Sequence, residues 1–201
     1  MVITAIKAQV KNADRASIFV DGKYSFSLSL NELVAEKLRT KQELNQPEIE
    51  RLKKLSADGK LKGRALEWVL GRPHSTREFQ DYLRRKKADP EQADAWEQEF
   101  IERGYLSDTA FAQWRIDVRR RGGKSERAIR SELLSKGLSR DIIDEELRED
   151  NNERARLDIL IAKKQKLSRY KADPQKLIQY LATKGFGFDD IKKALRGEEE
   201  Y

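Results

Sequence analysis

The first part of the chain alternates apolar and polar side chains, as in a β-sheet with one buried face. The run VITAIKAQV, which begins at Val2, follows this period of two, and the runs ASIFV and KYSFSL continue it. Asp21-Gly22 separates the last two runs. An Asp-Gly pair in this position is typical of a two-residue hairpin, because both turn positions need positive φ. Residues 2–28 are therefore predicted to form β structure.

After Asn31 the apolar residues recur with the period of a helix, and the helical part contains a repeat. Three segments align, beginning at Ser75, Ser125 and Asp173, and each begins with a side chain that can cap a first helical turn. Apolar residues lie four and eight positions after each cap, at Phe79 and Leu83, Ile129 and Leu133, and Leu177 and Leu181. A lysine lies eleven positions after each cap, at Lys86, Lys136 and Lys184. Glycine, a helix C-cap, follows in the second and third copies, and Lys87 takes its place in the first.

A longer helical segment precedes each copy and a shorter one follows it, so the repeating unit has three helices. One such unit of about 45 residues buries too little surface to fold alone, whereas stacked units share a core. We therefore expect a mainly α protein in which tandem three-helix repeats form an elongated curved solenoid, with a small N-terminal β-hairpin or meander. The expected divisions are a β extension leading into a helix (1–45), a linker helix with the first repeat (46–106), the second repeat (107–150), and the third repeat with an acidic tail (151–201).

The composition limits the classes of function. The chain has no cysteine and one histidine, which excludes disulfides, thiolate metal sites and multi-histidine zinc sites. We find no catalytic constellation, no metal site and no cofactor motif, and we expect a protein that is not an enzyme. The N-terminus lacks the apolar core of a signal peptide, and no run approaches the roughly 20 apolar residues that cross a membrane. A cytoplasmic protein with no membrane partner is expected.

The charge is unusual in amount and in distribution. Charged residues make up 38% of the chain, and the formal net charge is +7, which favours an anionic partner. The positive charge is concentrated between Arg115 and Arg140, a stretch with nine basic and three acidic residues. Because acidic neighbours are scarce there, we interpret this stretch as a binding surface for phosphates or carboxylates, both of which arginine binds bidentately. The candidate binding residues are Arg72, Arg115, Arg119, Arg120, Arg121, Lys124, Arg127, Arg130, Lys136 and Arg140.

Within this stretch, Gly123-Lys124-Ser125 has the letters that end a nucleotide-binding P-loop. The P-loop pattern needs a glycine five positions before Gly123 and a strand in front of the loop, but Val118 stands there and the preceding residues have helical spacing. We therefore interpret the glycines as the end of one helix and Ser125 as the cap of the next. Exposed amides at such a helix start would also suit a phosphate or a carboxylate.

The remaining polar and aromatic candidates favour structural roles. His74 has no partner residues in a triad pattern and is expected to pack at a turn between helices. Trp68, Trp96 and Trp114 fall at apolar helical positions and are expected in the core, and burial is also favoured for Tyr105. The three acidic residues from Asp144 to Glu146 are expected to form an exposed helix edge.

An ordered series of motifs resembles the bacterial RecX family. The motifs are Leu70 to Ser75 (LGRPHS), Gly104 to Asp108 (GYLSD) followed by Phe111-Ala112, Arg119 to Lys124 (RRRGGK), and Glu132 to Leu138 (ELLSKGL). The resemblance covers about residues 61–196, and the hairpin with Asp21-Gly22 is similar to the extension of RecX proteins from Gram-positive bacteria. Two features depart from the family pattern: Lys87 replaces the usual glycine, and the last repeat matches loosely.

The resemblance implies tandem three-helix units and a non-enzymatic modulator of RecA. Such a protein binds RecA and its filament on single-stranded DNA, and mostly restrains recombination, ATP hydrolysis and the cleavage that triggers the SOS response. The expected partners are therefore RecA, the RecA filament, and single-stranded or duplex DNA through phosphate contacts, with the protein itself a monomer. The alternative is a stand-alone DNA-binding regulator, because three-helix units resemble helix-turn-helix modules that read the major groove.

Overall fold

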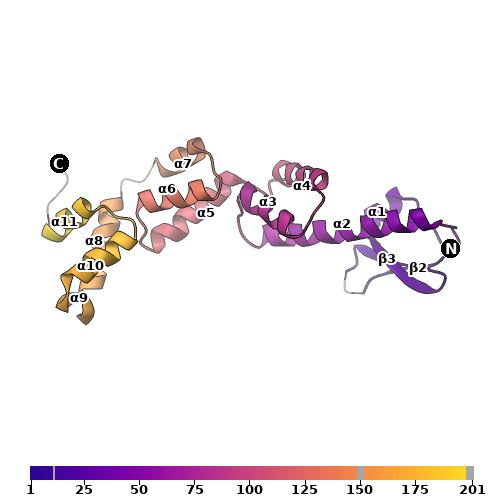
Figure 1. Cartoon of the computed structure of the whole chain (residues 1–201), viewed down its shortest axis with the longest axis horizontal. Coiled ribbons are helices and arrows are strands. Elements are labelled where there is room, and N and C mark those ends of the chain that lie inside the picture. The colour runs from indigo at the N-terminus through magenta and orange to yellow at the C-terminus, as the bar shows by residue number, and fades with distance from the viewer. Residues whose placement is uncertain (11, 149–151, 198–201) are drawn as a thin grey trace. The chain divides into compact units, whose positions relative to one another are not determined.

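The computed structural model describes residues 1–10, 12–148 and 152–197, and it is mainly helical with a small N-terminal sheet (Figure 1). The strands are β1 (Ile3–Ala8), β2 (Arg15–Val20) and β3 (Lys23–Ser29). The helices are α1 (Leu30–Ala35), α2 (Gln46–Leu70), α3 (Thr76–Arg85), α4 (Pro90–Glu102), α5 (Asp108–Arg121), α6 (Glu126–Ser135), α7 (Arg140–Leu147), α8 (Glu153–Gln165), α9 (Ser168–Ala172), α10 (Pro174–Thr183) and α11 (Phe188–Arg196). The predicted fold class is confirmed, whereas the predicted acidic tail lies outside the described residues.

Two compact units divide the chain. The first unit contains Met1–Leu70 and Leu83–Trp96, and the second contains Gly71–Tyr82 and Glu97–Tyr201. The first unit holds the sheet and α2. The second unit holds the helices from α5 onward, together with the first turns of α3 and the end of α4.

In the first unit the predicted hairpin is present. β1, β2 and β3 form an antiparallel sheet in chain order, and the turn between β2 and β3 places Asp21 at φ 47° and Gly22 at φ 82°. Both values are positive, as a two-residue turn that matches the sheet twist requires. The apolar face packs against α2 through buried residues that include Ile18, Phe26 and Leu52. α2 runs without a break over 25 residues, so the expected linker helix and the leading helix of the first repeat form one helix.

In the second unit two helical groups have the cores that the repeat predicts, although the last group has four helices in place of the expected three. α5, α6 and α7 surround one cluster that contains Phe111, Ile129 and Leu133, and α8 to α11 surround another that contains Leu177 and Leu181. All six apolar anchors of the aligned segments are buried. The short helix α9 was not predicted, because five residues are too few to establish a helical period.

The three-helix groups join each other in the same way at two places. At the first junction, the Ser75 hydroxyl donates to the Lys136 carbonyl at 2.9 Å, and the Thr76 amide donates to the Asp108 carboxylate at 2.8 Å. The start of α3 thus contacts two parts of the next group. These are the turn that ends α6 and the first residue of α5.

The second junction repeats this arrangement between α6 and the following group. There the Ser125 amide donates to the Lys184 carbonyl at 3.0 Å, and the Glu126 amide donates to the Glu153 carboxylate at 2.8 Å. Ser125 also caps α6 by accepting a hydrogen bond from the Ala128 amide. The interpretation of Ser125 as a helix cap is confirmed. The amides at this helix start do hold a carboxylate, as expected, but it is that of Glu153 from the neighbouring group.

The glycines of the Lys-Gly turns are needed for these junctions. Gly137 has φ 86°, and a Cβ there would lie 2.7 Å from Cδ of Arg77. Gly185 has φ 101°, and a Cβ there would lie 2.5 Å from Cβ of Ala128. Lys87, at the equivalent position of the first repeat, also has positive φ but is exposed, so its side chain meets no such neighbour. This difference explains why a lysine can replace the glycine in the first repeat.

Candidate functional site

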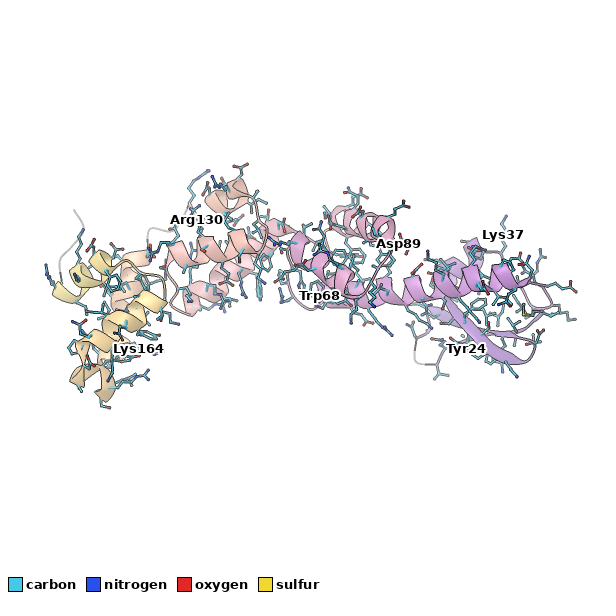
Figure 2. All side chains as sticks on the ribbon, viewed as in Figure 1. Tyr24, Lys37, Trp68, Asp89, Arg130 and Lys164 are labelled. Carbon is cyan, nitrogen blue, oxygen red and sulfur yellow. The ribbon has the colours of Figure 1, made fainter. Side chains whose placement is uncertain are left out.

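All ten candidate binding residues lie in the second unit. Arg72 precedes α3, Arg115 and Arg119 to Arg121 lie on α5, and Lys124 lies in the following turn. Arg130, labelled in Figure 2, lies on α6. Arg127 lies on the same helix, Lys136 ends it, and Arg140 begins α7. The structure therefore gathers these residues in the group α5–α7 and at its junctions.

Acidic partners are present for several of them, although the local sequence contains few. Glu132 of α6 accepts hydrogen bonds from Nε of Arg115 at 2.6 Å and from Nε of Arg119 at 2.7 Å. Burial alone would raise the pKa of Glu132, but the hydrogen bonds from Arg119 and Arg115 outweigh burial and lower it. One carboxylate thus holds two arginines between α5 and α6. Although acidic residues are few in this stretch of sequence, the fold pairs Arg115 and Arg119 with one of them.

A second carboxylate, Glu78, gathers three groups around the first junction. Its oxygens lie 3.0 Å from Nη1 of Arg72, 2.8 Å from Nζ of Lys136 and 3.1 Å from Nδ1 of His74. His74 is buried beside this cluster, as expected for a histidine packed at a turn between helices. Arg72 and Lys136 therefore contribute to the junction between successive groups, in addition to any contact with a partner.

Glu78 makes the stability of the second unit dependent on acid. Burial would raise its pKa, but the hydrogen bonds from Lys136 and Arg72 prevail and lower it from 4.5 to about 2. A lowered folded-state pKa contributes stability above the unfolded-state value, and that stability is lost as the pH falls from about 4.5 to about 2. The effect is at most about 3 kcal/mol.

We therefore expect the Glu78→Gln variant to be less stable than the parent at neutral pH and to lose less stability on acidification. Urea unfolding at a series of pH values between about 7 and 3 measures both effects, since the slope with pH reports the difference in bound protons. Replacement of the exposed Glu145, which pairs with the nearby Arg148, is the matched control. Equal acid sensitivity of the Glu78 variant and the parent would contradict the assigned role.

Arg130 also has acidic partners. It forms an ion pair with Asp144 of α7 and a longer one, 3.4 Å, with Glu126 one turn earlier on α6. Of the predicted acidic helix edge, Asp144 and Glu145 are exposed, whereas Glu146 is half-buried and accepts a hydrogen bond from Gln113. Asp144 restrains Arg130. Among the described residues, no group of three or more acidic or histidine side chains could hold a metal ion.

Three of the four aromatic expectations need correction. Trp114 is half-buried and not in the core, and the guanidinium groups of Arg72 and Arg115 lie 5.0 and 5.6 Å from its ring centroid. Tyr105, expected to be buried, is 38% exposed, with its ring edge-on to Phe100. Trp96 is buried as expected, and Trp68 is half-buried. Periodicity places a ring on the inner side of a helix, but a large ring at the margin of a small group stays partly exposed.

Other candidates face the last helical group, α8 to α11. Lys124 donates from Nζ to the Thr183 carbonyl at 3.1 Å, and Arg127 donates from Nε to the Gly185 carbonyl at 3.1 Å. Arg140 is exposed at the first turn of α7, and Arg121 is 78% exposed with a long ion pair to Asp117. The exposed cations of the stretch are therefore Arg121, Arg127 and Arg140, whereas Arg120 and Lys124 are half-buried.

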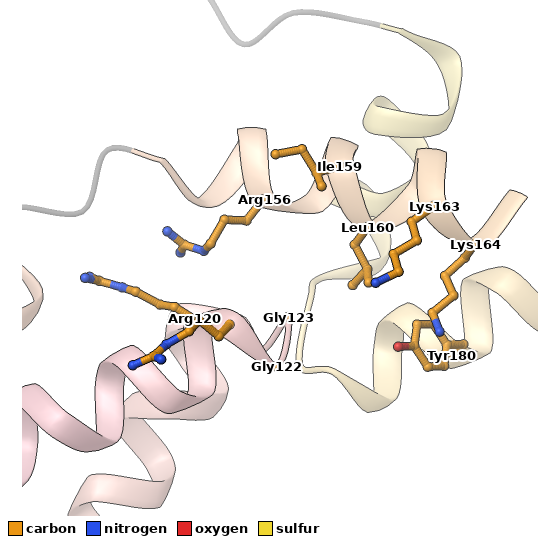
Figure 3. A pocket seen from close by; sticks show the side chains of 10 residues that line it. Arg120, Gly122, Gly123, Arg156, Ile159, Leu160, Lys163, Lys164 and Tyr180 are labelled. Carbon is orange, nitrogen blue, oxygen red and sulfur yellow. The ribbon is translucent and has the colours of Figure 1, made fainter. Parts of the chain in front are cut away.

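The structure also brings in basic residues that sequence reasoning missed. Arg156, Lys163 and Lys164 of α8 line the same hollow as Arg120 and Arg121 of α5 (Figure 3). A signal for them exists in the sequence, because residues seven and eight apart share one face of a helix. They were missed because they lie outside the stretch with the highest density of charge. Among the described residues, no helix is long and apolar enough to span a membrane.

Comparison with known proteins gives a consistent result. Residues 1–45 match the family model described as the regulatory protein RecX N-terminal domain, and residues 107–147 match the one described as the RecX second three-helix domain. The regulatory protein RecX of Lactobacillus johnsonii is 34% identical over 191 residues, which cover 92% of this chain and 70% of that protein. The RecX of Bacillus licheniformis is 35% identical over 212 residues, which cover 99% of this chain and 78% of that protein.

Solved structures agree on the fold. A crystal structure of a regulatory protein RecX aligns with a TM-score of 0.69 at 23% identity, and the alignment covers 96% of this chain and 98% of that one. The crystal structure of RecX from Lactobacillus salivarius aligns with a TM-score of 0.57 at 22% identity, covering 69% of this chain and 94% of that one. At these identities the structural likeness supports the arrangement of helices and strands.

Proposed function

Because this chain belongs to the RecX family of regulatory proteins, we propose that it binds RecA and the RecA filament on single-stranded DNA and mostly inhibits their activities. The activities concerned are strand exchange, ATP hydrolysis and the assisted cleavage that triggers the SOS response. Family membership is the observation that carries this proposal. The relatives are named regulatory proteins, which supports an action by binding rather than by catalysis.

The charge of the chain supports an anionic partner. A net charge of +7 favours association with the phosphates of a filament at long range. We propose that the ten candidate residues contribute unequally. Those at the end of α5 and in the following turn make the main electrostatic contact, led by the exposed Arg121, with the half-buried Arg120 and Lys124 beside it. The pairs around Glu132 and Glu78 mainly hold the helices together.

A time course of RecA-dependent ATP hydrolysis on single-stranded DNA tests the proposal. We expect the purified full chain to lower the steady rate of ATP hydrolysis in a dose-dependent manner. The reason is that a filament whose growth is restrained contains fewer active subunits. In the cell we propose that it acts in the cytoplasm. An unchanged rate with the chain in excess over RecA, together with no retention of RecA on the immobilised chain, would overturn the proposal.

The same time course distinguishes the proposed regulation of RecA from the alternative function, that of a stand-alone DNA-binding regulator. A regulator of that type binds duplex DNA with sequence preference, whereas phosphate contacts give a steep dependence on salt without such preference. Titration of duplexes of different sequence is therefore the companion measurement. Strong preference for one duplex, combined with no effect on RecA, would favour the regulator.

A further inference from the structure

The last helical group, α8 to α11, has a second open hollow, the α10 hollow, beside the start of α10. Its volume is about 300 Å³, and six residues line it: Gln165, Tyr170, Lys171, Pro174, Leu177 and Leu195. Tyr170 and Leu177 are buried and form its floor, whereas Gln165, Lys171 and Pro174 are exposed at its rim. The short helix α9 supplies Tyr170 and Lys171. The α10 hollow therefore combines an apolar floor with a polar and cationic rim.

At the two earlier middle helices, an acidic side chain from a neighbouring group occupies the equivalent place. The Asp108 carboxylate accepts a hydrogen bond from the Thr76 amide at 2.8 Å, and the Glu153 carboxylate accepts one from the Glu126 amide at 2.8 Å. Both acids are the first residue of a helix. Pro174 of α10 corresponds to Thr76 and Glu126, because each of the three follows a capping residue. The fold thus brings an acidic segment to this position twice within the chain.

At α10 a cation takes the place of the amide that holds those acids. Proline has no N–H to donate, but Lys171 lines the hollow together with Pro174. Between Lys163 and Lys176 the chain has six basic residues and one acidic residue, so the surroundings are strongly positive. The acidic residue, Asp173, caps α10 and pairs with Lys176 at 3.4 Å. An acidic segment is therefore the ligand that complements this rim in charge.

The floor of the α10 hollow favours an apolar group. Leu177, Leu195 and the ring of Tyr170 present hydrocarbon to the space. A large apolar side chain that entered it would remove apolar surface of both partners from water, which is favourable. Protein interfaces commonly place one such side chain in a pocket and surround it with polar contacts. The ligand that fits both parts of the hollow is a protein segment with acidic residues around one large apolar side chain.

Nucleic acid is the other polyanion to consider, and the surroundings of Tyr170 argue against it. Proteins hold single strands by stacking bases on exposed aromatic faces. Tyr170 is only 7% exposed. The guanidinium group of Arg169 lies 4.5 Å from the centroid of its ring, and the centroid of the Tyr180 ring lies 5.8 Å away. The one aromatic ring of the lining therefore offers no face on which a base could stack.

We propose that the α10 hollow docks an acidic segment of a protein partner. One large apolar side chain of that segment enters the hollow, and a carboxylate beside it meets Lys171 at the rim. The inference goes beyond the proposed function, because it assigns a surface and the chemistry of its ligand without requiring that the ligand belong to RecA. The surface also lies outside the ten candidate residues, which end at Arg140.

Short synthetic peptides test the site in the absence of RecA. The probe is a fluorescein-labelled, glutamate-rich peptide with one central phenylalanine, and its matched control has alanine in that position. The anisotropy of each peptide is titrated with the full chain. The variant Gln165→Trp covers the hollow from its rim, and Gln175→Trp places the same ring on an exposed position of α10 outside the lining. Lys171→Gln removes the rim cation, with the exposed Lys54 of the first unit, changed to Gln, as its control. Thermal unfolding followed by circular dichroism reports whether each variant keeps its fold.

We expect the phenylalanine peptide to bind about tenfold more tightly than the alanine peptide, the factor that burial of this ring provides. Gln165→Trp should abolish this preference, and Gln175→Trp should keep it. Lys171→Gln should weaken binding of the phenylalanine peptide about threefold, as expected for an ion pair at an exposed rim, and the Lys54 control should change it little. If Gln165→Trp fails to fold, the comparison of the two peptides on the parent and the effect of Lys171→Gln still decide.

Equal affinity for the two peptides would overturn the site, because charge alone would then explain binding. A preference for phenylalanine that survives Gln165→Trp would also overturn it, since the ring would then bind elsewhere. Binding of an oligothymidylate that Gln165→Trp weakens while peptide binding stays intact would overturn it in favour of nucleic acid. Self-association of the chain that Gln165→Trp abolishes would overturn it in favour of a second copy. The expected peptide binding by a chain without effect on RecA would support the site and contradict only the proposed function.

Discussion

The variant R120E/R121E/K124E is expected to lose its effect on RecA while keeping its fold. The three reversals lower the formal net charge of +7 by six, and they act at the end of α5 and in the following turn, where Arg121 is exposed and Arg120 and Lys124 are half-buried. Like charge facing the filament's phosphates is unfavourable at contact and at long range, so association should slow and the affinity should fall together. The rate of ATP hydrolysis by RecA on single-stranded DNA, with this variant added, should equal the rate of RecA alone.

Arg119 is left unchanged in this variant for a structural reason. Its guanidinium group donates two hydrogen bonds of 2.7 Å to Glu132, so a glutamate there would face a partly buried carboxylate and leave Arg115 to serve both. Loss of activity in an Arg119 variant could therefore come from loss of the α5–α6 contact. The variant K166E/K192E/K193E, with the same change in net charge, is the control. Full inhibition of RecA by the folded R120E/R121E/K124E variant would refute the assignment.

The substitution Gly185→Ala is expected to destabilise the second unit by about 2–4 kcal/mol. Gly185 has φ 101°, a left-handed conformation that an L side chain adopts at a cost of about 1–2 kcal/mol. The new methyl group would also lie 2.5 Å from Cβ of Ala128, so α6 or the turn has to move. That movement breaks the hydrogen bond from the Ser125 amide to the Lys184 carbonyl. Urea unfolding and hydrogen exchange of the Ser125 amide measure the two consequences.

The matched control is Gly104→Ala in the same unit. Gly104 has φ 70°, and no described atom lies within 4 Å of a Cβ built there, so this change isolates the backbone cost. It should destabilise by about 1 kcal/mol and leave the exchange of the Ser125 amide unaltered. Equal destabilisation by the two substitutions would show that Gly185 does not act through contact with α6.

The sequence predicted the elements of this fold well because their signals are local. Caps at Ser75, Ser125 and Asp173 begin helices as predicted, since a side chain that satisfies the first-turn amides acts within three residues. The Asp21-Gly22 turn follows from the φ values that its two residues tolerate. α9 and the exposure of Tyr105 escaped prediction, because five residues carry no period and a ring's exposure depends on what the neighbouring group covers.

The candidate site was predictable only in part. The density of arginines on α5 is visible in the sequence, but their partners are not. Glu132 lies 13 residues after Arg119 and Glu78 lies 58 residues before Lys136, and only the packing of helices brings these charges together. The basic residues of α8 were missed for the same reason. Arg156 and Lys163 line one hollow together with residues of α5, and this proximity exists only in the folded chain.

By itself the sequence determined most of the helices and strands, the recurrence of aligned helical segments, and which family the chain belongs to. These properties depend on periodicity and caps, which act over a few residues, and on ordered motifs, which can be recognised in the sequence itself. Only the tertiary structure decided that Gly123-Lys124-Ser125 is a junction whose amides are occupied, and that many of the arginines are held by carboxylates. It also decided that positive charge gathers between α5 and α8. The physical reason is that charge and hydrogen bonding act through space, so their balance is set by neighbours that may lie 60 residues away.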